Sequence, residues 1–189
     1  RTLGTIYAEV NILKNLVFRT TLNLDNTDNT SSSYNPYINA SNLATRLAQT
    51  TILTSGSYNT FRHQTFVNEN TLNYNTTVLK DISLNFLGGY SFTTDRNDLS
   101  TMSSNGGFSS SVIKTLSAAN AITGGSSGNK NTLESMFGRA QFSYKGKYLL
   151  SGSIRRDGSS RFAPNHKYGY FPSASAGWRI SEENFAKSI

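Results

Sequence analysis

Apolar and polar residues alternate one by one along several stretches of the chain. In residues 3–13 the even-numbered positions from 6 to 12 are apolar, and the positions between them are polar or amphipathic. A period of two is typical of a strand with one apolar and one polar face. The pair Lys14-Asn15 can turn the chain, and the alternation resumes over residues 16–25. These residues therefore predict a β-hairpin.

The same unit recurs further along the chain, and a last strand follows it. The predicted strands are residues 71–77 and 82–92 around the turn Leu79-Lys80-Asp81, residues 136–144 and 148–155 around the turn Lys145-Gly146-Lys147, and residues 170–180. The fold class predicted from this pattern is all-β, an antiparallel meander of about seven strands.

Long polar stretches separate the hairpins. Residues 26–57, 94–130 and 158–169 are rich in Asn, Ser, Thr and Gly, and we expect them to be long connections. Two of them could contain a short helix, one capped by Ser41 and running to Leu47, the other capped by Ser111 and running from Ile113 to Ala119. The run from Gly124 to Gly128 is typical of a flexible linker or a mobile surface loop.

Tight turns and long connections thus alternate strictly, so a meander would gather all tight turns at one end. Bacterial outer-membrane barrels have this arrangement, with short periplasmic turns, long extracellular loops and strands of about 9–11 alternating residues. A soluble β-sandwich would need a turn every 8–12 residues or so and would lack one-sided loops, so the pattern favours a transmembrane barrel. Seven strands cannot close a barrel, and open edges are not viable in lipid, so we expect the chain to be an excerpt of a longer one.

Polar and charged side chains on one face suit a water-filled barrel interior. The candidate lumen-facing residues are Glu9, Arg19, Asp25, Arg139, Gln141, Arg155 and Arg179. They could guide a substrate, but we favour pairing with one another or with a plug inside the barrel.

Composition changes this picture little. Charged residues make up 15% of the 189 residues, below the roughly 25% of soluble domains, while 12% aromatic residues argue against disorder. The net charge of +7 could indicate nucleic acid, anionic lipid or an acidic ligand, but the cations are scattered, and we expect no nucleic-acid partner. No long apolar run predicts a transmembrane helix, residues 1–20 lack the pattern of a signal peptide, and the chain contains no cysteine.

The sequence shows no catalytic or metal-binding constellation. His63 and His166 are far apart, with no acid at ligand spacing, and no nucleophile elbow or phosphate-binding loop is present. Glu182 and Glu183 lie side by side in a predicted turn, where we expect both to be solvated. We therefore expect no cofactor, no metal and no enzymatic activity.

The last third of the chain carries more specific motifs. The segment from Phe137 to Leu150 resembles the RNYxYKxKYLL hairpin of the SusC/RagA family, TonB-linked (TonB-dependent) outer-membrane transporters of Bacteroidetes. Two further segments resemble the R-x-DGSSRF and GYFPSxSAGWRISxE motifs of that family; they contain Arg155, Arg156, Asp157, Gly158, Ser159, Ser160, Arg161 and Phe162, then Gly169, Tyr170, Phe171, Pro172, Ser173 and Trp178. The resemblance covers residues 133–189, whereas residues 1–132 share only the pattern of the preceding barrel strands.

The resemblance implies a barrel of 22 strands closed by an N-terminal plug, of which this chain would hold about seven strands in one partial barrel domain, residues 1–189, without the plug. It also implies an outer-membrane location and TonB-driven import of oligosaccharides or peptides. The implied partners are a SusD-like surface lipoprotein, the TonB complex reached through a segment absent from this chain, outer-membrane lipid, and a glycan or peptide substrate. A passive porin and a soluble β-sandwich that binds carbohydrate are the alternatives; a plug and a TonB-binding segment before residue 1 would distinguish the importer.

The Asp157-Gly158-Ser159-Ser160 segment has two interpretations. It could bind ligand at the mouth of the barrel, or it could form a structural corner where the strand leaves the sheet, with Asp157 paired to Arg155, Arg156 or Arg161. We favour the structural interpretation, because a motif shared by transporters of diverse ligands should not encode ligand choice.

Aromatic residues near the strand ends predict two interfacial girdles. The inner girdle would contain Tyr144, Tyr148 and Trp178, which flank the tight turns, and the outer one Tyr90, Phe92 and Tyr170.

Overall fold

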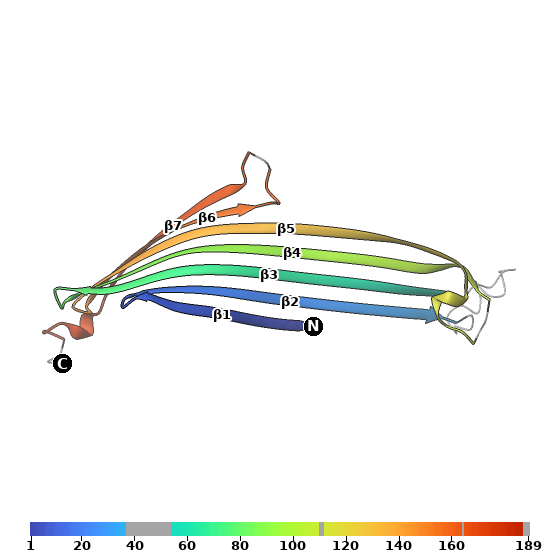
Figure 1. The fold of residues 1–189 in the computed structure, drawn as a ribbon, viewed down its shortest axis with the longest axis horizontal. Helices are drawn as coiled ribbons and strands as arrows, with labels where there is room; N and C mark the ends of the chain where they lie inside the picture. The colour runs from blue at the N-terminus through green and yellow to red at the C-terminus, as the bar shows by residue number, and fades with distance from the viewer. Residues whose placement is uncertain (37–53, 110–111, 164, 187–189) are drawn as a thin grey trace. The chain divides into compact units, whose positions relative to one another are not determined.

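The structure, a computed structural model, describes residues 1–36, 54–109, 112–163 and 165–186. The strands are β1 (Thr2–Leu13), β2 (Leu16–Asn35), β3 (Ser55–Val78), β4 (Ile82–Phe108), β5 (Ala119–Tyr144), β6 (Tyr148–Ser159) and β7 (Tyr168–Trp178). They form a 7-stranded sheet in chain order, an antiparallel meander (Figure 1). The predicted all-β fold class is therefore confirmed, and a strand is present at each predicted position, although some bounds differ.

The predicted long connections were largely wrong, because strands β2 to β5 are longer than the alternation indicated. Residues 26–35, 94–108 and 119–130 are all strand, and the run from Gly124 to Gly128 lies inside β5. Asn, Ser, Thr and Gly at these positions carry no apolar face that would reveal a strand. Their backbone groups nevertheless pair with neighbouring strands, which satisfies the hydrogen bonds that an irregular loop would leave to water.

The remaining predicted boundaries also need correction. The connection predicted at 158–169 shrinks to residues 160–167, because β6 continues to Ser159. The predicted helix at 113–119 is only a 3-10 helix, η2 (Leu116–Ala118), while Ser111 and the candidate helix at 41–47 lie outside the described residues. The last strand ends at Trp178, and a second 3-10 helix, η3 (Ile180–Glu182), follows.

The predicted tight turns are all present. Lys145 and Gly146 both have positive φ, 52° and 68°, and Lys147 N donates to Tyr144 O at 2.9 Å. Two successive left-handed residues give the twist that joins antiparallel strands best, and glycine adopts that conformation without strain. Leu79 and Lys80, with φ of 53° and 60°, turn the chain between β3 and β4 in the same way.

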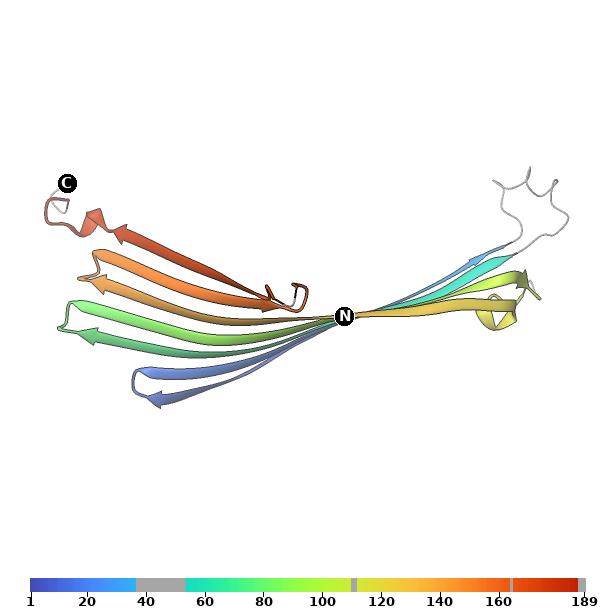
Figure 2. The ribbon, with the colours of Figure 1, turned by 90° about the horizontal axis from the view of Figure 1, so that it is seen from above.

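These turns lie side by side, as the alternation predicted (Figure 2). Backbone hydrogen bonds connect each turn with the next hairpin: Asn75 N donates to Asn15 O at 2.9 Å, Lys145 N to Asp81 O at 2.7 Å, and Arg179 N to Lys147 O at 2.8 Å. The end that carries the turns is called the turn end below.

The chain divides into two compact units. Unit 1 comprises Arg1–Thr2, Asn26–Gln64 and Arg96–Lys130; unit 2 comprises Leu3–Asp25, Thr65–Asp95 and Asn131–Ile189. Strands β2 to β5 contribute residues to both units. Unit 2 holds the turn end and the whole of β6 and β7, and unit 1 holds η2.

The register of β5, β6 and β7 separates two faces in unit 2. Even-numbered residues lie opposite even-numbered ones, as in Phe142–Leu150–Ala176, and odd opposite odd, as in Gln141–Ser151–Ser175. We call the even-numbered side of unit 2 the apolar face and the odd-numbered side the polar face.

No hydrophobic side chain is buried among the described residues. Large apolar side chains are instead exposed on the apolar face; Ile6 is 68% exposed, Leu150 54% and Ile154 55%. A contiguous apolar surface of this kind marks a place where another apolar phase or molecule covers the sheet. In the part of the chain that the structure describes, no helix is long and apolar enough to cross a membrane.

Candidate functional site

The polar face of unit 2 forms a concavity near the turn end. Its volume is about 930 Å³, and amides and hydroxyls from several strands line it, among them Asn75, Thr77, Asn85, Gln141, Ser143, Ser151 and Ser175. Asn85 donates to the side-chain oxygens of Asn73 at 2.6 Å and Asn75 at 2.5 Å, and the hydroxyls of Ser151 and Ser175 are 2.7 Å apart. Apolar residues, among them Leu149, also contribute to the lining, which is uncharged, and its polar groups can both donate and accept hydrogen bonds.

Gln141 is the candidate lumen-facing residue that this concavity contains. The other amides and serines had not been singled out, although odd-numbered polar positions next to the tight turns would have identified them. An uncharged lining of this kind suits neutral polar groups such as sugar hydroxyls or peptide amides.

Two other candidates, Glu9 and Arg19, meet on the polar face of β1 and β2. Arg19 Nη1 lies 3.9 Å from Glu9 Oε2, and its guanidinium carbon is 4.3 Å from the centre of the Tyr7 ring. Both side chains are about half exposed, so the ion pair contributes little to stability.

The remaining candidates are spread along the sheet. Asp25 lies in β2 and Arg139 lies in β5 opposite Ser153. Arg179 lies outside β7, between that strand and η3, so strand alternation does not set its direction. The structure therefore brings together Glu9 and Arg19 but does not join all the candidates in one site.

The Asp157 segment is organised around one ion pair on the polar face. Arg155 Nε donates to Asp157 Oδ1 at 2.7 Å, and Arg155 Nη2 donates to Ser135 Oγ at 3.1 Å. Ser135 lies opposite Asp157 in the register and is only 2% exposed. Sequence reasoning missed Ser135, which could have been found by counting outward from the Lys145–Lys147 turn.

The hydroxyl groups of this segment bind backbone rather than facing a cavity. Ser160 Oγ accepts from Thr132 N at 2.9 Å, and Ser159 Oγ accepts from Arg161 N at 3.2 Å. Arg161 and Phe162 are exposed in the connection to β7. The chain leaves the sheet after Ser159, two residues later than the expected corner, because β6 continues to pair through Gly158 and Ser159.

Arg156 points to the opposite face from Arg155. Its guanidinium carbon lies 3.7 Å from the centre of the Tyr168 ring, and Nη1 is 4.0 Å from Met136 Sδ. Gly158 lies opposite Tyr168, and a Cβ atom there would collide with the ring, so a side chain could not be accommodated without a shift. Of the three arginines expected around Asp157, the described structure joins only Arg155 to it.

The rest of the motif continues along β7. Tyr170 lies opposite Arg156, Pro172 opposite Ile154 and Ser173 opposite Ser153. The Phe171 ring covers Gly169 on the polar face. Proline lacks an N–H and is tolerated where a strand pairs on one side only, as β7 does among the described residues.

At the turn end, aromatic rings stack across three strands. The ring centres of Tyr144 and Tyr148 are 6.3 Å apart, those of Tyr148 and Trp178 are 6.5 Å apart, and both pairs are stacked. Phe185 meets Trp178 edge-on at 6.5 Å and had not been identified from the sequence. The residues expected in the outer girdle, Tyr90, Phe92 and Tyr170, all occupy even positions on the apolar face of unit 2.

Hydrogen bonds to Glu183 connect two of these aromatic residues with the segment that follows β7. Its carboxylate accepts hydrogen bonds from Lys147 Nζ at 2.9 Å, Tyr148 OH at 2.8 Å and Trp178 Nε1 at 3.2 Å. These donors, Lys147 first, lower the pKa of Glu183 to about 2. The expectation of a solvated Glu183 was therefore wrong; its side chain is 15% exposed.

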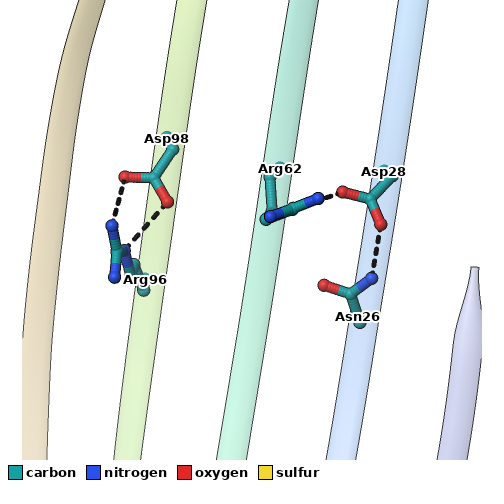
Figure 3. A network of polar contacts seen from close by, with 5 residues as sticks. All are labelled: Asn26, Asp28, Arg62, Arg96 and Asp98. Atoms are coloured by element: carbon teal, nitrogen blue, oxygen red, sulfur yellow. Dashed lines mark hydrogen bonds and ion pairs between the residues drawn. The ribbon is translucent and has the colours of Figure 1, made fainter.

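Unit 1 contains a separate polar network (Figure 3). Asp28 accepts hydrogen bonds from Arg62 Nε and Asn26 Nδ2, both at 2.5 Å, and Arg96 Nε lies 2.8 Å from Asp98 Oδ2. Asp28, Arg62 and Asp98 line a concavity of about 370 Å³. Sequence reasoning missed this network because it lies in stretches interpreted as loops or left outside the predicted strands.

Comparison with known proteins gives relatives along nearly the whole chain, although no family model matches. The chain is 34% identical to TonB-dependent receptor P39 of Formosa agariphila over 97% of its own length and 17% of the relative, and 31% identical to receptor P3 of the same organism over 97% and 18%. It is 48% identical to TonB-dependent receptor SusC of Bacteroides thetaiotaomicron over 60 residues, 32% of the chain and 6% of that protein.

Solved structures agree on the fold. The chain superimposes on the structure of the RagAB peptide transporter with a TM-score of 0.86 at 21% identity, covering 98% of the chain and 20% of that structure's chain. A second structure, the RagAB peptide importer in the "closed-closed" state, gives a TM-score of 0.85 at 20% identity, covering 97% and 20%.

The fold and its two faces thus define the class: a piece of the barrel wall of a TonB-dependent receptor. Within that class the chain resembles the SusC/RagA family in its motifs and in its match to SusC over 60 residues. It spans less than a fifth of the length of the curated relatives P39 and P3.

Proposed function

We propose that this chain forms part of the wall and mouth of an outer-membrane barrel that imports oligosaccharides or peptides by TonB-dependent transport. The single observation that carries the proposal is the sheet of unit 2, which exposes apolar side chains on one face and lines the other with uncharged polar groups. Transmembrane barrels alternate in this way, apolar toward lipid and polar toward the lumen.

The spacing of the aromatic residues on the apolar face supports a membrane placement. Tyr148 and Trp178 lie at the turn end, and Arg156 and Tyr170 lie opposite each other eight residues further along. At about 3.3 Å per residue and a tilt of about 40°, this stretch spans roughly 20 Å of bilayer, close to the apolar band of about 25 Å in such barrels. The turn end would face the periplasm and the 160–167 connection the outside.

The polar concavity supports the substrate class. Its amides and hydroxyls are matched to a neutral polymer rich in hydrogen-bonding groups, and both oligosaccharides and peptides meet that description. The solved neighbour RagAB is named a peptide transporter, whereas SusC and the Formosa receptors are named only as TonB-dependent receptors. A SusD-like lipoprotein would cap the mouth, and TonB would act through parts of the protein outside this chain.

The test is uptake by cells that carry the full-length protein. Labelled oligosaccharides and labelled peptides are supplied to cells with and without TonB, and with and without a protonophore. We expect uptake of one class, lost when TonB or the proton gradient is removed, with the amount of surface protein unchanged. Uptake that continues without TonB would contradict active import and favour the passive porin.

The soluble sandwich has less support. A sandwich requires a second sheet packed on the apolar face, whereas the described residues form a single 7-stranded sheet whose apolar side chains are exposed.

A further inference from the structure

A shallow groove crosses the apolar face of unit 2. Its volume is about 570 Å³, and its lining contains small residues, namely Gly88, Gly138, Ala140 and Gly152, and bulky ones, namely Leu72, Tyr74, Phe86 and Ile154. A Cβ atom on Gly88 would meet nothing within 4 Å, so the groove is open there. A hydrocarbon chain suits a shallow apolar groove whose lining includes several small residues.

A cation stands at one end of this groove. Arg156 lies two residues beyond Ile154 on the same face, about 7 Å along the strand. Its guanidinium stacks on Tyr168 and donates to the weak acceptor Met136 Sδ, and its Nε is buried with no hydrogen-bond partner among the described residues. A guanidinium offers five N–H donors in a fork that matches phosphate, and Arg156 leaves most of them unused.

The surrounding charges leave the site positive. Asp157 turns to the polar face and is paired with Arg155. Glu134 is the acid on the same face as Arg156, opposite Gly158 in the register, and no ion pair joins it to Arg156. Arg161 and Lys167 lie exposed in the connection from β6 to β7.

We propose that Arg156 and this groove form a binding site for a phosphorylated membrane lipid, with the phosphate on the guanidinium and an acyl chain in the groove. The inference rests on the proposed location in the outer membrane, where the apolar face of unit 2 meets lipid. Tyr168 and Tyr170 flank the headgroup position at the level where amphipathic aromatic rings prefer to lie. Charge complementarity selects the occupant: an apolar partner would leave the Arg156 donors unsatisfied.

The test uses the full-length protein, purified in an uncharged detergent and examined by native mass spectrometry with added lipid. Dioleoyl phosphatidic acid, dioleoylglycerol and inorganic phosphate serve as three probes: phosphate with chains, chains alone and phosphate alone. We expect phosphatidic acid to bind at least about tenfold more tightly than either of the other probes, as one sheltered charge-assisted hydrogen bond allows. Equal binding of dioleoylglycerol would overturn the phosphate contact, and equal binding of inorganic phosphate would overturn the groove.

Three variants locate the site. Arg156→Gln removes the charge, Gly152→Leu fills the groove, and Lys14→Gln makes the same change of charge at the turn end. The proposal expects the first two to weaken phosphatidic acid binding about tenfold and the third to leave it unchanged. Equal binding of phosphatidic acid by all variants would overturn the proposal. A dimer in which a second copy of the protein covers this face in place of lipid would overturn it as well.

Two further readouts keep the outcome unambiguous. If Arg156→Gln fails to assemble, Arg156→Lys retains the charge, and the proposal then requires this variant to bind phosphatidic acid about tenfold more tightly than Gly152→Leu does. Membrane fractionation and TonB-dependent uptake of the same proteins separate the lipid-binding site from the proposed function. A protein that imports substrate in the outer membrane but binds no lipid contradicts the lipid-binding site alone. A protein that is found outside the outer membrane contradicts the proposed function.

Discussion

Tyr148 and Trp178 lie opposite each other on β6 and β7, with stacked rings 6.5 Å apart, and both donate a hydrogen bond to the carboxylate of Glu183. A residue beyond the last strand thus fixes the orientation of two rings on the apolar face. In a barrel these rings would stand at the inner membrane interface, with their polar atoms held toward water.

Acid should loosen the turn end. The pKa of Glu183 is lowered to about 2 from an ordinary 4.5, so its contribution to stability is present above about pH 4.5 and is lost as the pH falls toward 2. We expect the urea midpoint of the full-length protein to fall over this range, and the difference between wild type and Glu183→Gln to shrink with it. A difference that stays constant from pH 6 to pH 2 would contradict the role given to the carboxylate.

Adjacent residues in β5 should tolerate charge very differently. Ala140 faces the apolar side and lines the groove, so Ala140→Arg would place a charge near the middle of the lipid band at a cost of about 2–4 kcal/mol. Gln141 lines the polar concavity, where Gln141→Arg adds a charge in water. We expect much less heat-modifiable surface protein for the first variant, and equal amounts would refute the facing of the two residues.

Asp157 should support assembly rather than choose the ligand. Asp157→Ala leaves Arg155 without its ion-pair partner beside the buried Ser135. Because Arg155 is half exposed, we expect a loss of only about 1 kcal/mol and a modest fall in assembled protein. Uptake per surface molecule, measured with the native ligand and a shorter analogue, should fall equally for both. Selective loss of one ligand with normal assembly would make the segment a binding site.

Replacement by alanine should destabilise one glycine position on the apolar face and leave another almost unaffected. A Cβ atom on Gly158 would collide with the Tyr168 ring, whereas one on Gly88 meets open space. We expect Gly158→Ala to cost about 1–3 kcal/mol through overpacking, and Gly88→Ala to be nearly neutral. Both effects are measured by heating each variant and recording the temperature at which half of its folded, faster-migrating gel band is lost. Similar midpoint temperatures for the two variants would contradict the packing of Tyr168 on Gly158.

Much of unit 2 could be predicted because one face of each strand is apolar. The alternation around Lys14-Asn15 and Lys145–Lys147 located the hairpins, and counting from those turns gives the faces of residues such as Gln141 and Leu150. Unit 1 could not be predicted in the same way. Its strand residues, such as those near Asp28 and Asp98, are polar on both faces, so no period of two appears.

The contacts between side chains were the second feature that could not be predicted from the sequence. Asp157 has three arginines nearby in the sequence, but strand alternation sends Arg155 to its own face and Arg156 to the other. The hydrogen bonds of Glu183 depend on how the chain bends after Trp178, which neither composition nor spacing specifies.

The central claim, a barrel wall with lipid on one side and water on the other, is tested most directly at two adjacent residues of β6. Spin labels are attached through single cysteines substituted for Leu150 or Ser151 in an otherwise cysteine-free full-length protein in lipid bilayers, and their collision rates with oxygen and with a water-soluble nickel complex are compared. Leu150 lies opposite Phe142 and Ala176 on the apolar face, and Ser151 opposite Gln141 and Ser175 on the polar face. The account predicts that the label at position 150 collides more often with oxygen than with the nickel complex, and that this order is reversed at position 151. Equal exposure at both positions, or the opposite order, would contradict it.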